Sequence, residues 1–306
     1  MKFSFIITVD TEGDNLWGYK EGDTITTNNA LYIPRFQELC EKYGFKPVYL
    51  TNYEMICDDR FVSYIKPKAE AGLCEIGIHV HAWNNPPFYQ ILGPYNGNSY
   101  LIEYPDEIMR AKFKVTYDLI CDKIGIPPVS HRAGRWAMND KYFQLLKEFK
   151  ITVDCSYTPG VNWNNTLGKT IGGSDYSKEK NVVKIIDGIV EVPATIERFY
   201  LTNQGSLKSR LKKFLKGYDA WLRPAYTDYQ TMCRVIRKHA GSKTNDFLEF
   251  MIHSSELMEG GSPYYKTKDD IENQYQTMER LFRKAMSMGF TGTTLREFYS
   301  NWNITK

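Results

Sequence analysis

Strands and helices alternate along almost the whole chain, and this alternation limits the fold more than any other feature of the sequence. Short β-branched and aromatic runs are followed by stretches with helical spacing. Such alternation favours right-handed strand–helix–strand units and a parallel sheet. With roughly seven strands, the pattern predicts barrel-like closure in a single domain over residues 1–306. The predicted strands cover residues 3–9, 47–51, 75–81, 129–132, 151–155, 189–193, 247–252 and 291–295. The predicted helices cover residues 30–43, 58–71 (interrupted by Pro67), 105–124, 139–149, 206–239 (broken at Pro224), 268–288 and 296 onward.

Two of the five histidines, His79 and His81, lie two residues apart in an apolar run. Alternate residues of a strand point to the same face, so both imidazoles converge if the strand continues through His81. Imidazole is the commonest metal-ligating side chain, and a metal site needs at least one further ligand. The pair therefore indicates a metal site, or else a strand end whose imidazoles are satisfied by backbone and solvent.

Other polar residues follow the carboxyl ends of predicted strands, where parallel α/β folds place their working groups. Each alone has a structural explanation, such as a helix N-cap or a pair with a carboxylate at the sheet end. Their joint placement favours one shared site. These residues are Asp10, Glu12 and Asp14 after the first strand, and then Arg132, Asp154 and His253.

Four motifs, in chain order, resemble those of the polysaccharide deacetylase superfamily, the NodB-homology-like carbohydrate esterases. They are Asp10-Thr11-Glu12, Glu75-Ile76-Gly77-Ile78-His79, Ser130-His131-Arg132-Ala133-Gly134-Arg135 and Ile252-His253-Ser254. The first motif, with His-x-His, is most similar to members from capsule and lipopolysaccharide loci. The resemblance implies a distorted (β/α)7 barrel. It also implies metal-dependent removal of N-acetyl groups from amino sugars in surface-polysaccharide biosynthesis.

The resemblance also implies a metal site. Glu12 matches the metal-binding carboxylate and His79 the first metal histidine. The family's second histidine falls four residues later, where this chain has Trp83, and His81 is the substitute on the same strand face. The implied cofactor is a divalent ion, with zinc as the first candidate. Such an ion polarises an amide carbonyl and lowers the pKa of a bound water.

Three further residues match the family's catalytic groups. Asp10 corresponds to the base that takes a proton from water, and Arg132 to the arginine that keeps this base ionised and oriented. His253 corresponds to the general acid that protonates the leaving amine. We expect an N-acetylated sugar or glycan as substrate.

Aromatic side chains near these motifs are candidates for stacking on sugar rings. Trp83, Tyr157 and Trp163 are the predicted stacking residues, although rings of this kind also pack in cores and loops. Arg135, in the third motif, is a further candidate substrate-binding residue.

A basic amphipathic segment begins at Ser206, outside these motifs. Leu207, Leu211, Phe214, Leu215, Tyr218 and Leu222 fall at helical spacing, with cations on the other face. Around Lys208–Lys216 this pattern is typical of a helix that lies on a membrane or binds a lipid-linked substrate. It is equally typical of a barrel helix that packs its apolar stripe inward.

Charge and cysteine content limit the remaining classes. A net charge of +3 does not favour nucleic-acid binding, and six scattered cysteines do not form a disulfide or zinc framework. No transmembrane segment or signal peptide is predicted, so we expect a cytoplasmic protein. Two alternatives stay open: a metal-independent amidohydrolase of a small cyclic amide, and an inactive carbohydrate-binding barrel.

Overall fold

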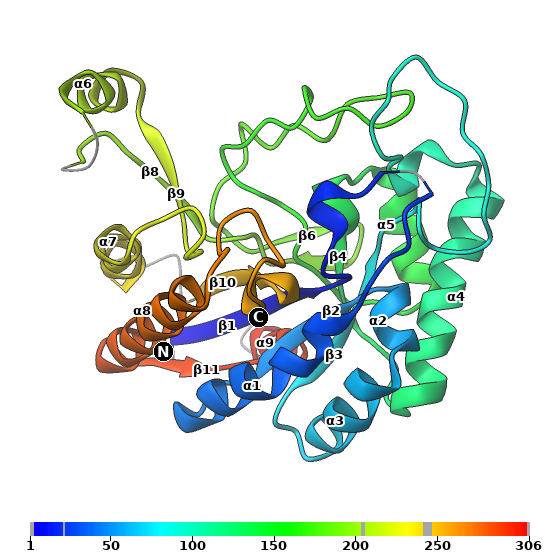
Figure 1. The fold of residues 1–306 in the computed structure, drawn as a ribbon, viewed down its shortest axis with the longest axis horizontal. Helices are drawn as coiled ribbons and strands as arrows, with labels where there is room; N and C mark the ends of the chain where they lie inside the picture. The colour runs from blue at the N-terminus through cyan, green and yellow to red at the C-terminus, as the bar shows by residue number, and fades with distance from the viewer. Residues whose placement is uncertain (1–2, 21, 203–205, 241–246, 305–306) are drawn as a thin grey trace.

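A curled, mainly parallel sheet forms the centre of the molecule in the computed structural model, which describes residues 3–20, 22–202, 206–240 and 247–304 (Figure 1). The main strands are parallel and follow the order β10-β1-β2-β3-β4-β5-β7. At the edges, β6 pairs antiparallel with β7, and β11 pairs with the start of β1. The strands are β1 (Phe3–Thr11), β2 (Pro47–Thr51), β3 (Glu75–Val80), β4 (Ser130–Ala133), β5 (Val153–Asp154), β6 (Lys184–Ile186), β7 (Ile189–Glu191), β10 (Phe247–His253) and β11 (Phe290–Gly292).

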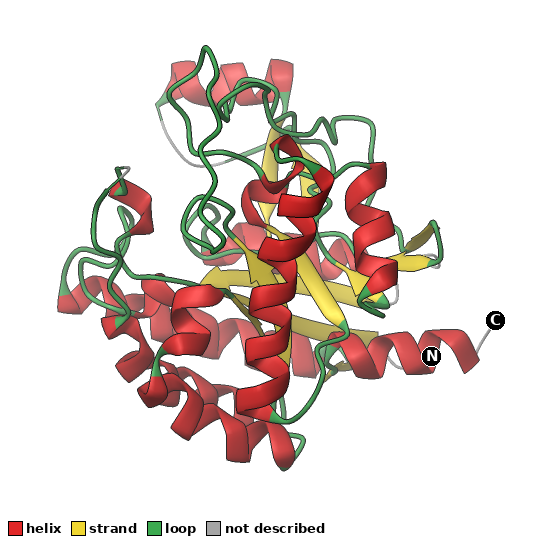
Figure 2. Ribbon diagram, turned by 90° about the vertical axis from the view of Figure 1, so that its right-hand side faces the viewer, coloured by secondary structure: helices red, strands yellow, loops and turns green. Residues whose placement is uncertain are grey.

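Helices cover the outside of the sheet, and long loops gather at one end (Figure 2). Asn139 caps α5 by accepting a hydrogen bond from the Tyr142 amide, and Gly125 ends α4 at a φ of 84°. The helices are α1 (Ile33–Lys42), α2 (Tyr53–Cys57), α3 (Asp59–Glu70), α4 (Asp106–Ile124), α5 (Asp140–Glu148), α6 (Leu207–Lys216), α7 (Tyr229–Ala240), α8 (Lys268–Ser287) and α9 (Leu295–Ile304). Among the described residues, every helix is too short or too polar to span a bilayer.

The predicted α/β fold, a distorted barrel of parallel strands, is confirmed, and over the part of the chain that the structure describes, hydrogen bonding leaves the ring of strands incomplete. In the described residues β7 and β10 are the open ends of the parallel arc. The gap is bridged by single backbone bonds, from the Leu222 amide to the Thr195 carbonyl at 2.9 Å and from the Met251 amide to the Leu222 carbonyl at 3.3 Å. The barrel is therefore distorted where β7 meets β10.

Strand register brings distant polar residues together at the carboxyl end of the sheet. Asp10 on β1 lies beside His253 on β10, and His79 on β3 lies beside Arg132 on β4. Because all four strands are parallel, these side chains share one end of the sheet.

Two local predictions are wrong. The segment after Gly217 is not helical: β9 (Tyr218–Trp221) pairs antiparallel with β8 (Ile196–Phe199), so the predicted helical stripe ends before Tyr218. Pro67 does not interrupt α3, which continues through it to Glu70.

Candidate functional site

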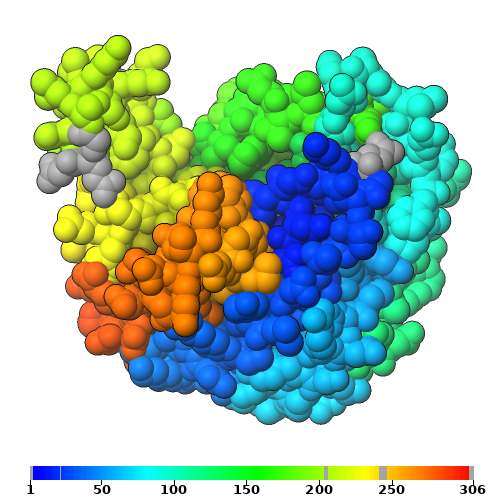
Figure 3. Space-filling model, viewed as in Figure 1, coloured from blue at the N-terminus to red at the C-terminus, as the bar shows by residue number. Residues whose placement is uncertain are grey.

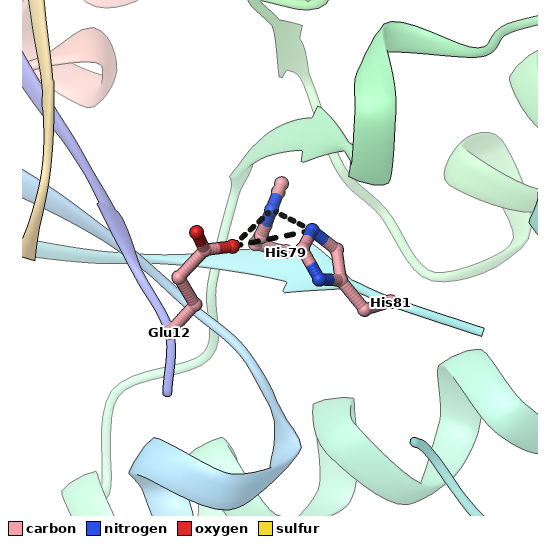
Figure 4. A group of neighbouring side chains, drawn as sticks. All are labelled: Glu12, His79 and His81. Carbon is pink, nitrogen blue, oxygen red and sulfur yellow. Dashed lines mark hydrogen bonds and ion pairs between the residues drawn. The ribbon is translucent and has the colours of Figure 1, made fainter. Parts of the chain in front are cut away.

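Glu12, His79 and His81 point toward one another at the carboxyl end of the sheet (Figure 4). The Nε2 atoms of the two histidines lie 2.9 Å apart. Glu12 Oε2 lies 3.2 Å from His81 Nε2 and 3.7 Å from His79 Nε2. All three residues are buried. The short distance between the two Nε2 atoms shows that the imidazoles converge as predicted, although β3 ends at Val80.

The free atoms of this group fit a divalent cation. His79 Nδ1 donates to the Arg132 carbonyl at 2.8 Å, which leaves the lone pair on Nε2 directed into the group. Glu12 Oε2 is buried and has no hydrogen-bond partner among the described residues. Burial raises the pKa of Glu12 to about 7, although His79 acts in the opposite direction. One carboxylate and two imidazoles are donors that zinc and similar ions prefer.

The backbone of Glu12 is fixed by two buried side chains. Ser254 Oγ accepts a hydrogen bond from the Glu12 amide at 3.1 Å, and Asn29 Nδ2 donates to the Glu12 carbonyl at 2.7 Å. Asn29 also donates to Ser254 Oγ at 2.8 Å. These contacts fix the backbone of Glu12 just after the end of β1. Supporting contacts of this kind orient the side chains that bind a metal ion.

Asp10 lies beside this group and forms an ion pair with the fully buried Arg132. Arg132 Nη1 donates to Asp10 Oδ1 at 2.7 Å, and Nη2 donates to Glu249 at 2.5 Å. Burial alone would raise the pKa of Asp10, but the charge of Arg132, with His79 and His253, lowers it well below its usual range. Asp10 is therefore ionised.

His253 also lines this site, next to Arg223, a residue that the sequence did not single out. Its Nε2 lies 3.7 Å from Asp10 Oδ2 and 3.8 Å from Glu12 Oε1. Its Nδ1 accepts a hydrogen bond from Arg223 Nη2 at 2.9 Å, and the same guanidinium pairs with the buried Glu256. Burial and the charge of Arg223 lower the pKa of His253 well below its usual range. Arg223 was missed because the segment around it was predicted to be helical. The candidate catalytic and metal-binding residues all came from the ends of predicted strands.

These groups open into a pocket of about 430 Å³ whose lining includes five tryptophan and tyrosine side chains. Trp83 stacks on His81 with ring centroids 4.4 Å apart, and Trp17 packs against His253 at 4.9 Å. Rings around a polar centre suit the faces of a sugar. The other aromatic residues that line the pocket are Trp136, Trp163 and Tyr226.

Arg135 also lines the pocket, in a left-handed backbone conformation with a φ of 55°. Its guanidinium donates to the carbonyls of Asn98 and Leu167 and lies 4.2 Å from the Tyr100 ring centroid. The side chain thus ties two loops of the pocket together.

Three residues singled out in the sequence lie elsewhere. Tyr157 is half-buried against Tyr176, with ring centroids 4.5 Å apart, and does not belong to the pocket lining. Asp14 accepts hydrogen bonds from the amides of Asn28 and Asn29, at the start of a short 3-10 helix, instead of facing Glu12. Asp154 pairs with the buried His131 at 2.7 Å, in a network beneath the pocket. The chain turns after Glu12, so strand alternation no longer predicts where Asp14 points.

The fold is the one found in polysaccharide deacetylases. A solved structure from Mycobacterium smegmatis, assigned as a polysaccharide deacetylase, has 13% identity and a TM-score of 0.56, over 100% of this chain and 92% of that chain. The 4-alpha-glucanotransferase from Thermococcus litoralis also has 13% identity and a TM-score of 0.56, over 98% of this chain and 40% of that chain. No family model and no curated protein matches the sequence. At this identity the likeness concerns the fold, which serves more than one activity, so function has to be argued from the site.

Proposed function

We propose that this chain is a metal-dependent hydrolase that removes an acetyl group from the nitrogen of an amino sugar. One observation carries the proposal: a buried carboxylate–imidazole group stands next to an arginine-held carboxylate in one aromatic pocket. Glu12, His79 and His81 would hold the ion. When bound, it would polarise the amide carbonyl and lower the pKa of a water.

Asp10 is the residue placed to move the proton. Arg132 occupies its Oδ1, so Oδ2, which faces His253, is left to accept a proton from water. As water oxygen adds to the acetyl carbon and the carbon–nitrogen bond breaks, the same carboxyl can return that proton to the amine. Acetic acid and the free amine of the sugar result, which at neutral pH are acetate and an ammonium group, so atoms and charge balance.

His253 acts as a hydrogen-bond donor in this proposal. Arginine has no acceptor, so the bond from Arg223 leaves Nδ1 unprotonated and places the proton on Nε2, which faces the pocket. A neutral imidazole is a very weak acid. The geometry thus favours stabilisation of developing charge by Nε2–H over the general-acid role that the resemblance implies.

The proposal is tested by acetate release from short oligosaccharides of N-acetylated amino sugars. The purified chain, loaded with zinc or another divalent ion, should release one acetate for each amine exposed, and Asp10→Asn should not. Acetate release that persists after complete metal removal would favour the amidohydrolase alternative. Sugar binding without acetate release in the metal-loaded protein would favour the inactive binding barrel. The surface-polysaccharide pathway and the cytoplasmic location remain predictions from the sequence.

A further inference from the structure

α6 projects from the body of the protein, at the upper left of Figure 1, beside the β8–β9 hairpin. None of its residues is buried. A helix that formed part of a barrel wall would bury its apolar stripe against the sheet. The packing of α6 therefore contradicts the barrel-wall interpretation of this segment.

The apolar face of α6 is turned outward. Leu207, Leu211, Phe214 and Leu215 fall within about 100° of arc on an ideal helix. Their exposed fractions are 82%, 58%, 55% and 69%. Tyr200 and Leu201, which precede the helix, are also more than half exposed. An exposed apolar patch of this kind marks an interaction surface.

Two cations on the other side of the helix contact neighbouring parts of the protein, although four of the five cations are exposed. Lys213 Nζ lies 4.9 Å from the centroid of the Tyr218 ring, and Arg210 Nε donates to the Thr202 carbonyl at 3.2 Å. The helix carries five cations and no acidic residue. Lys208 and Arg210 flank the apolar stripe on its two sides, as the helical spacing requires.

We propose that α6 is the docking surface of this protein for an anionic lipid bilayer. The apolar stripe would enter the boundary between headgroups and acyl chains, while the flanking cations pair with lipid phosphates. Charge complementarity selects this occupant over a second copy of the chain, because two α6 helices would bring ten like charges together. The exposed leucines and phenylalanine favour a bilayer over nucleic acid, because a phosphate backbone has no apolar region in which these side chains could be buried.

Docking through α6 would hold the pocket close to the bilayer. The chain runs from Gly217 through β9 (Tyr218–Trp221) to Arg223, and six residue steps span at most about 20 Å. Figure 3 shows a hollow between the α6 projection and the loops over the pocket. If the proposed deacetylase function holds, the substrate class is an N-acetylated sugar carried on a lipid headgroup. The docking itself does not depend on that function.

Co-sedimentation of the full chain with vesicles tests the docking. We expect binding to vesicles of phosphatidylglycerol and phosphatidylcholine at low salt, and much weaker binding at high salt or to phosphatidylcholine alone. Lys208→Gln with Arg210→Gln, which removes the two cations that flank the stripe, should weaken the binding by at least about tenfold. Leu211→Gln with Leu215→Gln should do the same through the apolar face, with little effect on stability because neither side chain is buried. The matched control is Lys266→Gln with Lys268→Gln, two exposed lysines at the start of α8, which should bind like the wild type.

Several outcomes would overturn the proposal. The first is absence of binding to anionic vesicles at low salt, and the second is equal weakening in the Lys266 and Lys268 control. A dimer in sedimentation velocity that the leucine variant abolishes, without vesicle binding, would assign the face to a second copy instead. The vesicle assay contains no sugar, so its failure is distinguishable from a failure of the acetate-release assay.

Discussion

Arg223 donates a hydrogen bond from Nη2 to Nδ1 of His253 at 2.9 Å, and this contact fixes which nitrogen of His253 carries the proton. The two residues are 30 positions apart in the sequence. Arg223 lies just after β9, and His253 is the last residue of β10. The proton on Nε2 points toward Asp10 and Glu12. The neighbouring arginine thus sets the hydrogen-bonding character of the His253 ring in the pocket.

Replacing Arg223 should change the tautomer of His253 and the turnover together. In the wild type, ¹⁵N NMR should show Nε2 protonated and Nδ1 unprotonated. In Arg223→Met both tautomers should be populated, and kcat should fall by about 10- to 100-fold with a smaller change in KM. Because Glu256 loses its partner, Arg223→Met with Glu256→Gln should restore the fold but not kcat. Arg198→Met, which breaks an exposed pair with Asp219 on the β8–β9 hairpin, is the control. Protonated Nδ1 in the wild type would contradict the assignment.

Arg132→Met should destabilise the fold strongly, beyond any effect on Asp10. The guanidinium is fully buried and pairs with both Asp10 and Glu249, and its removal leaves two buried carboxylates without a countercharge. We expect a loss of about 3–5 kcal/mol in the free energy of unfolding, measured by urea denaturation. Asp10→Asn keeps the shape of the pair and should lose far less stability while kcat collapses. A loss below about 1 kcal/mol in Arg132→Met would show that water reaches these carboxylates.

Removal of any of the three proposed metal ligands should abolish bound metal and acetate release together. His79→Ala and Glu12→Gln each leave two of the three donors, so elemental analysis should find little zinc or other divalent ion in either purified variant. His239→Gln, which changes a buried histidine paired with Glu197 at 2.8 Å in another part of the molecule, should keep the wild-type content. Unchanged metal in His79→Ala would remove His79 from the ligand set.

Asp58, the N-cap of α3, should make the free energy of unfolding decrease at acidic pH. Burial raises the pKa of Asp58, but hydrogen bonds from Arg60 and Thr27 outweigh this and lower it to about 2. Its folded pKa lies below the unfolded value, so its contribution is complete above about pH 4 and is lost as the pH falls toward 2. The difference in Tm between wild type and Asp58→Asn should therefore be largest near pH 6 and shrink from pH 4 downward. Asp59→Asn, at an exposed pair with Lys123, should change Tm little at any pH. A constant difference for Asp58→Asn would contradict this account.

Much of the architecture was predictable because it depends on local pattern. Strand–helix alternation predicted the parallel sheet. Functional residues of parallel sheets lie at the carboxyl ends of the strands, and this rule predicted that Asp10, His79, Arg132 and His253 share one end. The i, i+2 spacing predicted that His79 and His81 face the same way, and their Nε2 atoms do meet. These predictions succeeded because a strand's side-chain period is fixed by its backbone.

Other features depend on contacts between distant segments. Tyr218 and Leu222 continue the helical spacing of α6, yet pairing with β8 makes this segment a strand. Tyr157 has the chemistry of a stacking ring but packs against Tyr176. Arg223 reaches His253 only because β9 leads the chain to the gap between β7 and β10.

The amino-acid sequence by itself determined the α/β class, the end of the sheet at which Asp10, His79, Arg132 and His253 gather, and the amphipathic character of α6. Only the tertiary structure decided that the apolar face of α6 points outward, that Asp14 turns away from Glu12, and that Arg223 fixes the proton of His253. Periodicity records how side chains are distributed around one element. It carries no information on which face of that element meets the rest of the chain, because that depends on the free energy of packing against distant residues.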